Sequence, residues 1–187
     1  MNNGYSTIEK NSKENRGYRM NKNAKFYIGV KALIMNDKNE VLLLKAAPSE
    51  TKFEKKQTDA FGRLKHVEFW DFPGGRVKEK SDAKGVSYSE TLENTLKTEC
   101  LEEISIKKIE IVKIFSAVIS NFMIKDSFDE KSPLALIVYN CKTDLNNKIK
   151  LSHEHTEYKW FAIKEAKKLL ETKYPKSFVE KLDEVKK

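Results

Sequence analysis

Trp70 to Ile106 read WDFPGGRVKEKSDAKGVSYSETLENTLKTECLEEISI, and this stretch decides the fold. Residues 67–72 predict a short β-strand, and the following Pro-Gly-Gly predicts a sharp turn because glycine adopts backbone angles that other residues avoid. Residues 87–104 then contain neither proline nor glycine, and we expect one of their first serines to cap a helix. Apolar residues at every fourth position predict that this helix is amphipathic: Leu92, Leu96, Cys100 and Ile104.

Three glutamates share one side of this predicted helix. Glu99, Glu102 and Glu103 are spaced i, i+3 and i+4, and at about 100° per residue Glu99 and Glu103 project close to the apolar stripe. Like charges at this spacing repel one another, and partial burial adds a desolvation cost, so a bound cation is expected to compensate. Oxygen ligands without thiolates favour Mg²⁺ or Mn²⁺. Taken alone, the glutamates are more typical of a solvated acidic helix face; the preceding turn favours the metal site.

With this turn and helix the chain resembles the Nudix family. The family motif runs Gly, five residues, Glu, seven residues, Arg-Glu, an apolar residue, any residue, Glu-Glu, any residue, Gly and an apolar residue. The matching residues of this chain are Gly75, Glu90, Glu99, Cys100, Glu102, Glu103 and Ile106. The likeness covers residues 26–170, because FYIGVKALIMNDKNEVLLLK resembles the family's first strands and SHEHTEYKWFAIKEAKKLL its closing strand and helix.

Three features depart from the family motif. Fourteen residues rather than five separate Gly75 from Glu90, so we expect an inserted loop in KEKSDAKGVSY. Thr98 stands where the family has an arginine that orients a catalytic glutamate, which implies reduced activity or a rearranged support for that glutamate. Ser105 stands in place of the later glycine and predicts a different exit from the helix.

The resemblance implies the α/β Nudix fold, a mixed β-sheet between α-helices, in a single domain over residues 25–187 that includes the C-terminal helices. It implies a hydrolase that uses Mg²⁺ or Mn²⁺ to cleave a diphosphate linkage in a nucleoside triphosphate, a nucleotide sugar or a dinucleoside polyphosphate. Glu99, Glu102, Glu103 and the carbonyl of Gly75 would bind the metal, and Glu99 or Glu102 would serve as the catalytic base or position the attacking water.

Other charged residues are candidates for contact with the substrate. Lys45, at the end of a predicted strand, and Arg76, directly after the turn, are expected near the glutamate helix, where both would bind phosphate. Glu154 lies in a segment from which some family members supply another ligand or base, and His153 and His155 flank it. An ordinary solvated charge is as good an interpretation for Lys45 and Arg76, and a better one for Glu154.

The rest of the chain gives simpler patterns. Residues 1–24 are polar and predict a disordered tail. Residues 26–35 and VLLLK predict a hairpin of two strands, with Ile28, Val30, Ala32 and Ile34 on one face, and residues 46–66 predict a long loop. Further on, two strands and then two helices are predicted, the second helix beginning at Pro175: KIEIVKIFSAVIS, LALIVYNCK, IKEAKKLL and PKSFVEKLDEVKK.

Composition limits the class of protein. The 187 residues are 39% hydrophobic and 34% charged, which fits one globular domain, and no apolar run reaches the roughly 20 residues that cross a bilayer. The polar N-terminus lacks a secretory signal, so we expect a cytoplasmic protein. Two cysteines, Cys100 and Cys141, indicate no disulfide framework.

Other functions stay open at this point. A net charge of +8 suits phosphorylated partners, but the lysines are scattered, so nucleic acid is expected only as a capped or phosphorylated substrate. Thr98 motivates the alternative of a catalytically impaired Nudix-like domain that binds a nucleotide or regulates. Isoprenoid diphosphate isomerisation ranks last, because no matching cysteine motif is present. The oligomeric state, a homodimer included, is undetermined.

Overall fold

The computed structural model describes residues 24–47, 57–58, 64–65, 69–78, 80–82, 85–87, 91–125, 131–144 and 149–185. The predicted tail up to residue 23 and the motif residue Glu90 lie outside the described residues. Within the described part, no helix is both long and apolar enough to cross a membrane.

Two three-stranded sheets form the centre of the molecule. In the first sheet β1 runs parallel to β9, and β9 runs antiparallel to β8; in the second, β2 lies between antiparallel neighbours β10 and β5. Parallel and antiparallel pairs together confirm the predicted mixed sheet. The strands are β1 (Tyr27–Ile34), β2 (Glu40–Ala46), β5 (Trp70–Asp71), β8 (Ile109–Lys125), β9 (Lys131–Thr143) and β10 (His155–Ala162).

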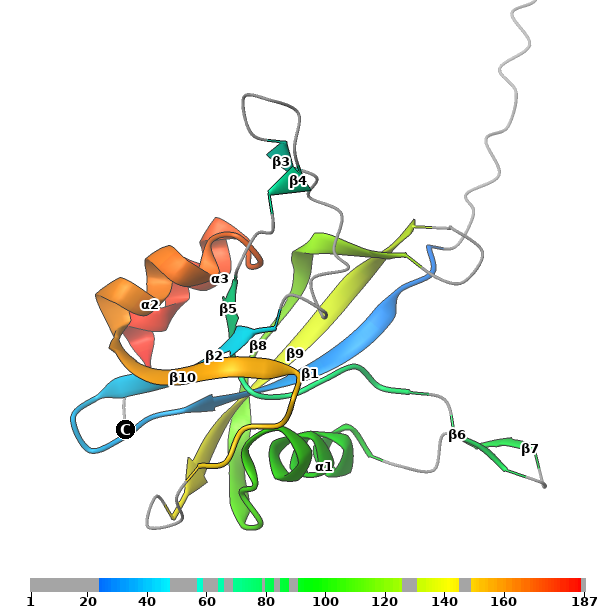
Figure 1. Cartoon of the computed structure of the whole chain (residues 1–187), viewed down its shortest axis with the longest axis horizontal. Helices are drawn as coiled ribbons and strands as arrows, with labels where there is room; N and C mark the ends of the chain where they lie inside the picture. Colours follow the sequence, from blue (N-terminus) through cyan, green and yellow to red (C-terminus); the bar gives the residue numbers. More distant parts are fainter. Residues whose placement is uncertain are drawn as a thin grey trace, which may run out of the picture.

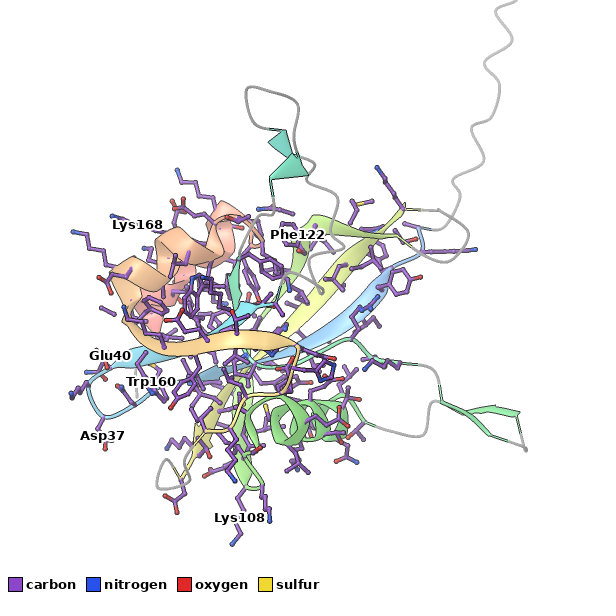
Figure 2. The ribbon with its side chains drawn as sticks, viewed as in Figure 1. Asp37, Glu40, Lys108, Phe122, Trp160 and Lys168 are labelled. Carbon is purple, nitrogen blue, oxygen red and sulfur yellow. The ribbon has the colours of Figure 1, made fainter. Side chains whose placement is uncertain are left out.

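Helices cover both sides of these strands, as predicted (Figure 1). The helix α1 packs on one side, where its apolar stripe meets Val30, Ala32 and Ile34 of β1. On the other side, α2 and α3 pack against Leu33. Lys108 and Lys168 point outward, away from both cores (Figure 2). The helical elements are α1 (Leu92–Ile104), α2 (Ile163–Leu170), α3 (Lys176–Lys181) and the short 3₁₀ helix η2 (Leu182–Glu184).

The expected face of β1 is confirmed except at its start, because the Ile28 side chain is 41% exposed and lies outside the core. The hairpin prediction is wrong. The tight turn exists, with the N–H of Asn36 donating to the carbonyl of Glu40 at 3.0 Å, but β1 and β2 then diverge into different sheets. The physical reason is that the Pro-Gly-Gly turn occupies the edge of β1 that a hairpin partner would have used.

Several other boundaries differ from the prediction. Two short strands, β3 (Gln57–Thr58) and β4 (Leu64–Lys65), pair within the predicted long loop, and β9 begins at Lys131, before the predicted strand LALIVYNCK. The inserted loop after the turn contains a small hairpin of β6 (Lys80–Asp82) and β7 (Gly85–Ser87). Helix α3 begins one residue after Pro175, which is its N-cap.

Helix α1 begins later than predicted. Thr91 is its N-cap, and the Thr91 hydroxyl accepts from the N–H of Asn94 at 3.2 Å. Ser87 instead ends β7. The hairpin of the insertion therefore includes Ser87, the first residue that the prediction assigned to the helix.

The exit of α1 is left-handed. Ser105 has φ 58° and ψ 24°, its N–H donates to the carbonyl of Leu101 at 3.0 Å, and the N–H of Ile106 reaches the carbonyl of Cys100 at 3.3 Å. This is the C-terminal turn in which glycine is common. The expectation of a different exit is wrong, because the serine adopts the conformation that a glycine would favour.

Ser105→Gly is therefore expected to stabilise the protein. Relief of the left-handed conformation should outweigh the loss of the weak bond from the Ser105 hydroxyl to the carbonyl of Lys150, 3.3 Å long, and raise the free energy of unfolding by about 0.5 kcal/mol. Urea denaturation measures this change in the free energy of unfolding. Ser105→Ala, which loses the hydroxyl but keeps the strain, is the control and should be slightly less stable than the native chain. A glycine variant less stable than the native chain would contradict the prediction.

Candidate active site

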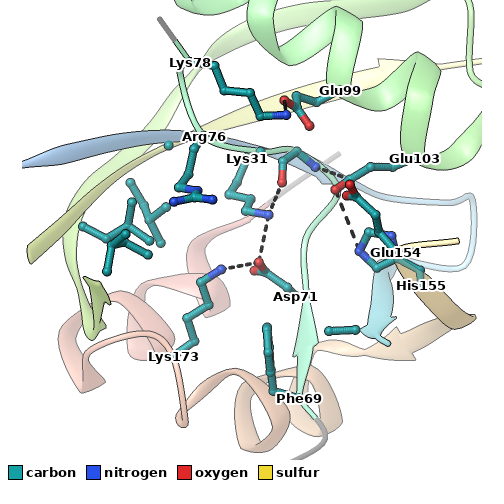
Figure 3. A pocket seen from close by; sticks show the side chains of 17 residues that line it. Lys31, Phe69, Asp71, Arg76, Lys78, Glu99, Glu103, Glu154, His155 and Lys173 are labelled. Carbon is teal, nitrogen blue, oxygen red and sulfur yellow. Dashed lines mark hydrogen bonds and ion pairs between the residues drawn. The ribbon is translucent and has the colours of Figure 1, made fainter. Parts of the chain in front are cut away.

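A cavity of about 280 Å³ lies between α1, the Pro-Gly-Gly turn and the start of β10 (Figure 3). Charged residues of both signs line it. The carboxylates come from α1, from β5 and from the residue just before β10. The cationic side chains come from β1, from the segment after the turn and from the segment between α2 and α3. The ionisable lining residues are Lys31, Asp71, Arg76, Lys78, Glu99, Glu103, Glu154, His155 and Lys173.

The fold brings five of the seven predicted site residues to this cavity: Gly75, Arg76, Glu99, Glu103 and Glu154. The other two do not line it. Glu102 is exposed on α1, and Lys45 lies on β2 opposite Trp70 of β5 and Glu157 of β10. The assignment of Glu102 to the metal or the water, and of Lys45 to phosphate, therefore stays a prediction.

Glu103 is the more buried of the two α1 carboxylates that line the cavity. Its Oε2 accepts the N–H of Gly74 at 2.6 Å, and its Oε1 lies 3.8 Å from Nε2 of His155. Burial raises the pKa of Glu103 to about 7; Glu99 adds to this rise, while Lys31 and the Gly74 N–H oppose it. Burial therefore makes the negative charge on Glu103 unfavourable.

Glu99 lies one helical turn before Glu103 and faces the same cavity. Burial raises its pKa, against the opposing charges of Lys78 and Lys31, and the Lys78 ammonium lies 3.7 Å from its Oε1. Gly75 touches it closely: a Cβ built on Gly75 would lie 2.2 Å from Oε2 of Glu99. Only glycine leaves room for the Glu99 carboxylate beside the turn.

A hard divalent cation fits these donors. The carboxylates of Glu99 and Glu103 face the cavity that Gly75 also lines, and their raised pKa values show that added positive charge would be favourable there. The described residues hold no cluster of three or more His, Cys, Asp or Glu side chains able to enclose a metal by themselves. Mg²⁺ in particular is usually bound by one or two carboxylates, with water and substrate phosphate completing its shell.

A buried charge cluster forms the floor of the cavity, and sequence reasoning missed it. The Asp71 carboxylate pairs with the ammonium groups of Lys31, at 2.8 Å, and Lys173, and the Tyr174 hydroxyl donates to it at 2.7 Å. Burial alone would raise the pKa of Asp71, but Lys173 and Lys31 hold it well below its usual range. A usable signal was present: lysine inside an apolar strand and aspartate between two aromatic residues are expected to be buried only when paired.

His155 lies beside Glu103 as a neutral imidazole. Burial lowers its pKa to about 4, and the charge of Lys31 contributes in the same direction. Its Nδ1 is buried and has no hydrogen-bond partner within the part of the chain that the structure describes. The sequence prediction that His155 contacts the substrate is not tested by this placement.

Comparison with known proteins adds the family. The family model for the NUDIX domain matches residues 25–182, and a comparison with curated proteins gives no match. The MutT protein from Methanosarcina mazei Go1 has a similar structure, with 26% identity, a TM-score of 0.53 and coverage of 86% of this chain and 93% of that chain.

Other solved structures share the fold at lower identity. A C. elegans Ap4A hydrolase, solved as a binary complex, is 19% identical with a TM-score of 0.52 and covers 84% of this chain and 93% of its own. The E. coli dihydroneopterin triphosphate pyrophosphohydrolase is 18% identical with a TM-score of 0.50 and covers 86% and 97%. Because the family model covers most of its length, including the turn and the glutamate helix, this chain belongs to the Nudix family of hydrolases.

Proposed function

We propose that the protein is a pyrophosphohydrolase that requires Mg²⁺ or Mn²⁺ and cleaves the diphosphate linkage of a nucleotide-like substrate. One observation carries this proposal: two buried carboxylates, Glu99 and Glu103, lie beside the Pro-Gly-Gly turn in a cavity that also contains Arg76 and Lys78. Acidic groups able to hold a cation and cationic groups able to hold phosphate therefore share one cavity.

Each side chain has a role in this proposal. Glu99, Glu103 and the Gly75 carbonyl hold the metal, which when bound neutralises the diphosphate and favours ionisation of the attacking water. Glu102 lies on the same helix but faces solvent, where it joins the ligands of the metal or positions the attacking water. The base is Glu99 or Glu102.

The cationic residues hold the substrate. Arg76 and Lys78 follow the turn directly and bind the oxygens of the diphosphate, which orients the phosphorus for in-line attack. Glu154 lies at the rim, close enough to Glu99 to affect its pKa, and supplies a further acidic group. Lys45 is kept as a phosphate contact only for a substrate that extends beyond the cavity.

The substrate is a nucleoside triphosphate, a nucleotide sugar or a dinucleoside polyphosphate. Proteins with this fold are named for varied substrates, among them Ap4A and dihydroneopterin triphosphate, so the fold does not select one class. A capped or phosphorylated nucleic acid belongs in the same panel.

The test is a substrate panel with and without metal. The purified chain is incubated with each compound and Mg²⁺ or Mn²⁺, products are identified by mass spectrometry, and ¹⁸O-labelled water marks the phosphorus that is attacked. We expect cleavage within a diphosphate that stops when EDTA removes the metal. Glu103→Gln is the inactive control, and Glu93→Gln, which changes an exposed glutamate of the same helix outside the cavity, is the matched active control.

The alternative is a domain that binds a nucleotide without cleaving it. It is favoured by Thr98, which is exposed on α1 and replaces the arginine of the family motif. Binding of a nucleotide by calorimetry, without turnover across the panel, would support this alternative and contradict the hydrolase.

A further inference from the structure

The ammonium group of Lys31 is buried against the Pro-Gly-Gly turn. It donates to the carbonyl of Phe72 at 3.1 Å and to the carbonyl of Gly74, and it pairs with the Asp71 carboxylate at 2.8 Å. An ammonium group has three N–H donors. All three N–H donors are therefore directed at residues of the turn or just before it, and none is left for a substrate.

The backbone of β1 holds the remaining carbonyls of the turn. The N–H of Ala32 donates to Pro73 at 2.8 Å, and the N–H of Val30 donates to Gly75 at 2.9 Å. Four consecutive carbonyls, at residues 72–75, are thus bound by three consecutive residues of β1. Two of the four depend on the Lys31 side chain rather than on the backbone.

The Gly74 peptide unit connects these hydrogen bonds between β1 and the turn to the glutamate helix. Its carbonyl accepts from Lys31, while its N–H donates to Oε2 of Glu103 at 2.6 Å (Figure 3). Gly74 has φ 122°, a conformation that glycine tolerates and that other residues rarely adopt. Thr98, which replaces the arginine of the family motif, is exposed on α1.

We propose that Lys31 is the positioning residue of Glu103. It fixes the peptide orientation of Gly74 so that the Gly74 N–H holds the Glu103 carboxylate toward the cavity, and Asp71 keeps the ammonium in place. Lys31 touches neither metal nor substrate. The effect of this arrangement on metal binding rests on the proposed function, but the arrangement of the turn itself does not.

Lys31→Met tests this role. Methionine keeps an unbranched, buried chain and removes all three donors. The Asp71 carboxylate keeps Lys173 and Tyr174 as partners, so the variant does not leave the buried Asp71 charge unpaired, and we expect it to fold.

Two measurements read the turn and the site separately. The first is the amide resonance of Gly74 in a ¹⁵N-labelled, metal-free sample, which should lie downfield in the native protein because its N–H is bound to a carboxylate. The second is the affinity for Mn²⁺, measured by calorimetry. In Lys31→Met we expect the Gly74 resonance to move upfield and the Mn²⁺ affinity to fall by about 10- to 100-fold, the usual effect of losing a group that orients a ligand.

Tyr174→Phe is the matched control. It removes a buried hydrogen bond to Oδ1 of the same Asp71, whereas Lys31 pairs with Oδ2, and Tyr174 does not line the cavity. We expect a lower melting temperature with the Gly74 resonance and the Mn²⁺ affinity unchanged. A Lys31→Met protein that behaves like Tyr174→Phe in both measurements overturns the proposal.

The proposal can still be tested if Lys31→Met does not fold or if the native chain binds no Mn²⁺. If Lys31→Met does not fold, Lys31→Gln, whose amide can still bond one carbonyl, is expected to show partial loss in both measurements, and native values would overturn the proposal. If the native chain binds no Mn²⁺, the proposed function fails, whereas the Gly74 resonance still tests the role of Lys31.

Discussion

Replacing Glu103 by glutamine is expected to lower metal-dependent hydrolysis by about a thousandfold, which corresponds to roughly 4 kcal/mol of transition-state stabilisation. Glutamine has the same shape and its carbonyl oxygen can still accept the N–H of Gly74, so the turn should stay in place. The negative charge is lost, and with it the attraction for the cation. Steady-state kinetics with a substrate identified from the panel measures the effect.

The fold of this variant should be retained. Glu103 is 5% exposed and its negative charge is unfavourable there, so removal of this charge should not lower the melting temperature of the metal-free protein. Glu102→Gln is the comparison: because Glu102 is exposed and outside the cavity lining, we expect a smaller loss of activity. Equal losses would place Glu102 in the metal shell, and activity of Glu103→Gln within threefold of the native value would contradict the proposed site.

The glutamate helix and the turn were predictable because their signals are local. The spacing of Glu99 and Glu103 beside an apolar stripe predicted that both would adjoin the core, and both are buried. A helix places residues i and i+4 on one side whatever the rest of the chain does. The start of the helix was not predicted correctly, because Ser87, the first residue assigned to it, pairs in the hairpin of the insertion, and Thr91 is the N-cap.

The pairing of β1 and the floor of the cavity could not be predicted in the same way. Asp71 meets Lys173 across 102 residues and Tyr174 across 103, and no periodicity in the sequence encodes such a contact. The same holds for β1, whose edge is taken by a turn about 40 residues later instead of by the adjacent strand. The lysine at position 31 marked an unusual site, but only the fold identifies its partners.

Gly74→Ala and Gly75→Ala should separate folding from catalysis within one turn. At Gly74, a Cβ would lie 2.3 Å from the carbonyl oxygen of Val30, and the residue has φ 122°. The backbone of β1 cannot move aside without breaking its hydrogen bonds to the turn. We therefore expect the free energy of unfolding to fall by roughly 3–5 kcal/mol, from strain and overlap together. Urea denaturation measures this loss.

At Gly75 the same substitution meets a side chain instead. The added Cβ would lie 2.2 Å from Oε2 of Glu99, and the contacts come from the carboxylate end of that side chain, which can rotate away. We therefore expect Gly75→Ala to fold with a loss of no more than about 1 kcal/mol, while hydrolysis falls by about 100-fold because Glu99 leaves its place beside the turn. Comparable loss of stability in both variants, or full activity in Gly75→Ala, would contradict this division. The first outcome would mean that the neighbouring glycines share one structural role, and the second that the position of Glu99 beside the turn does not matter for the reaction.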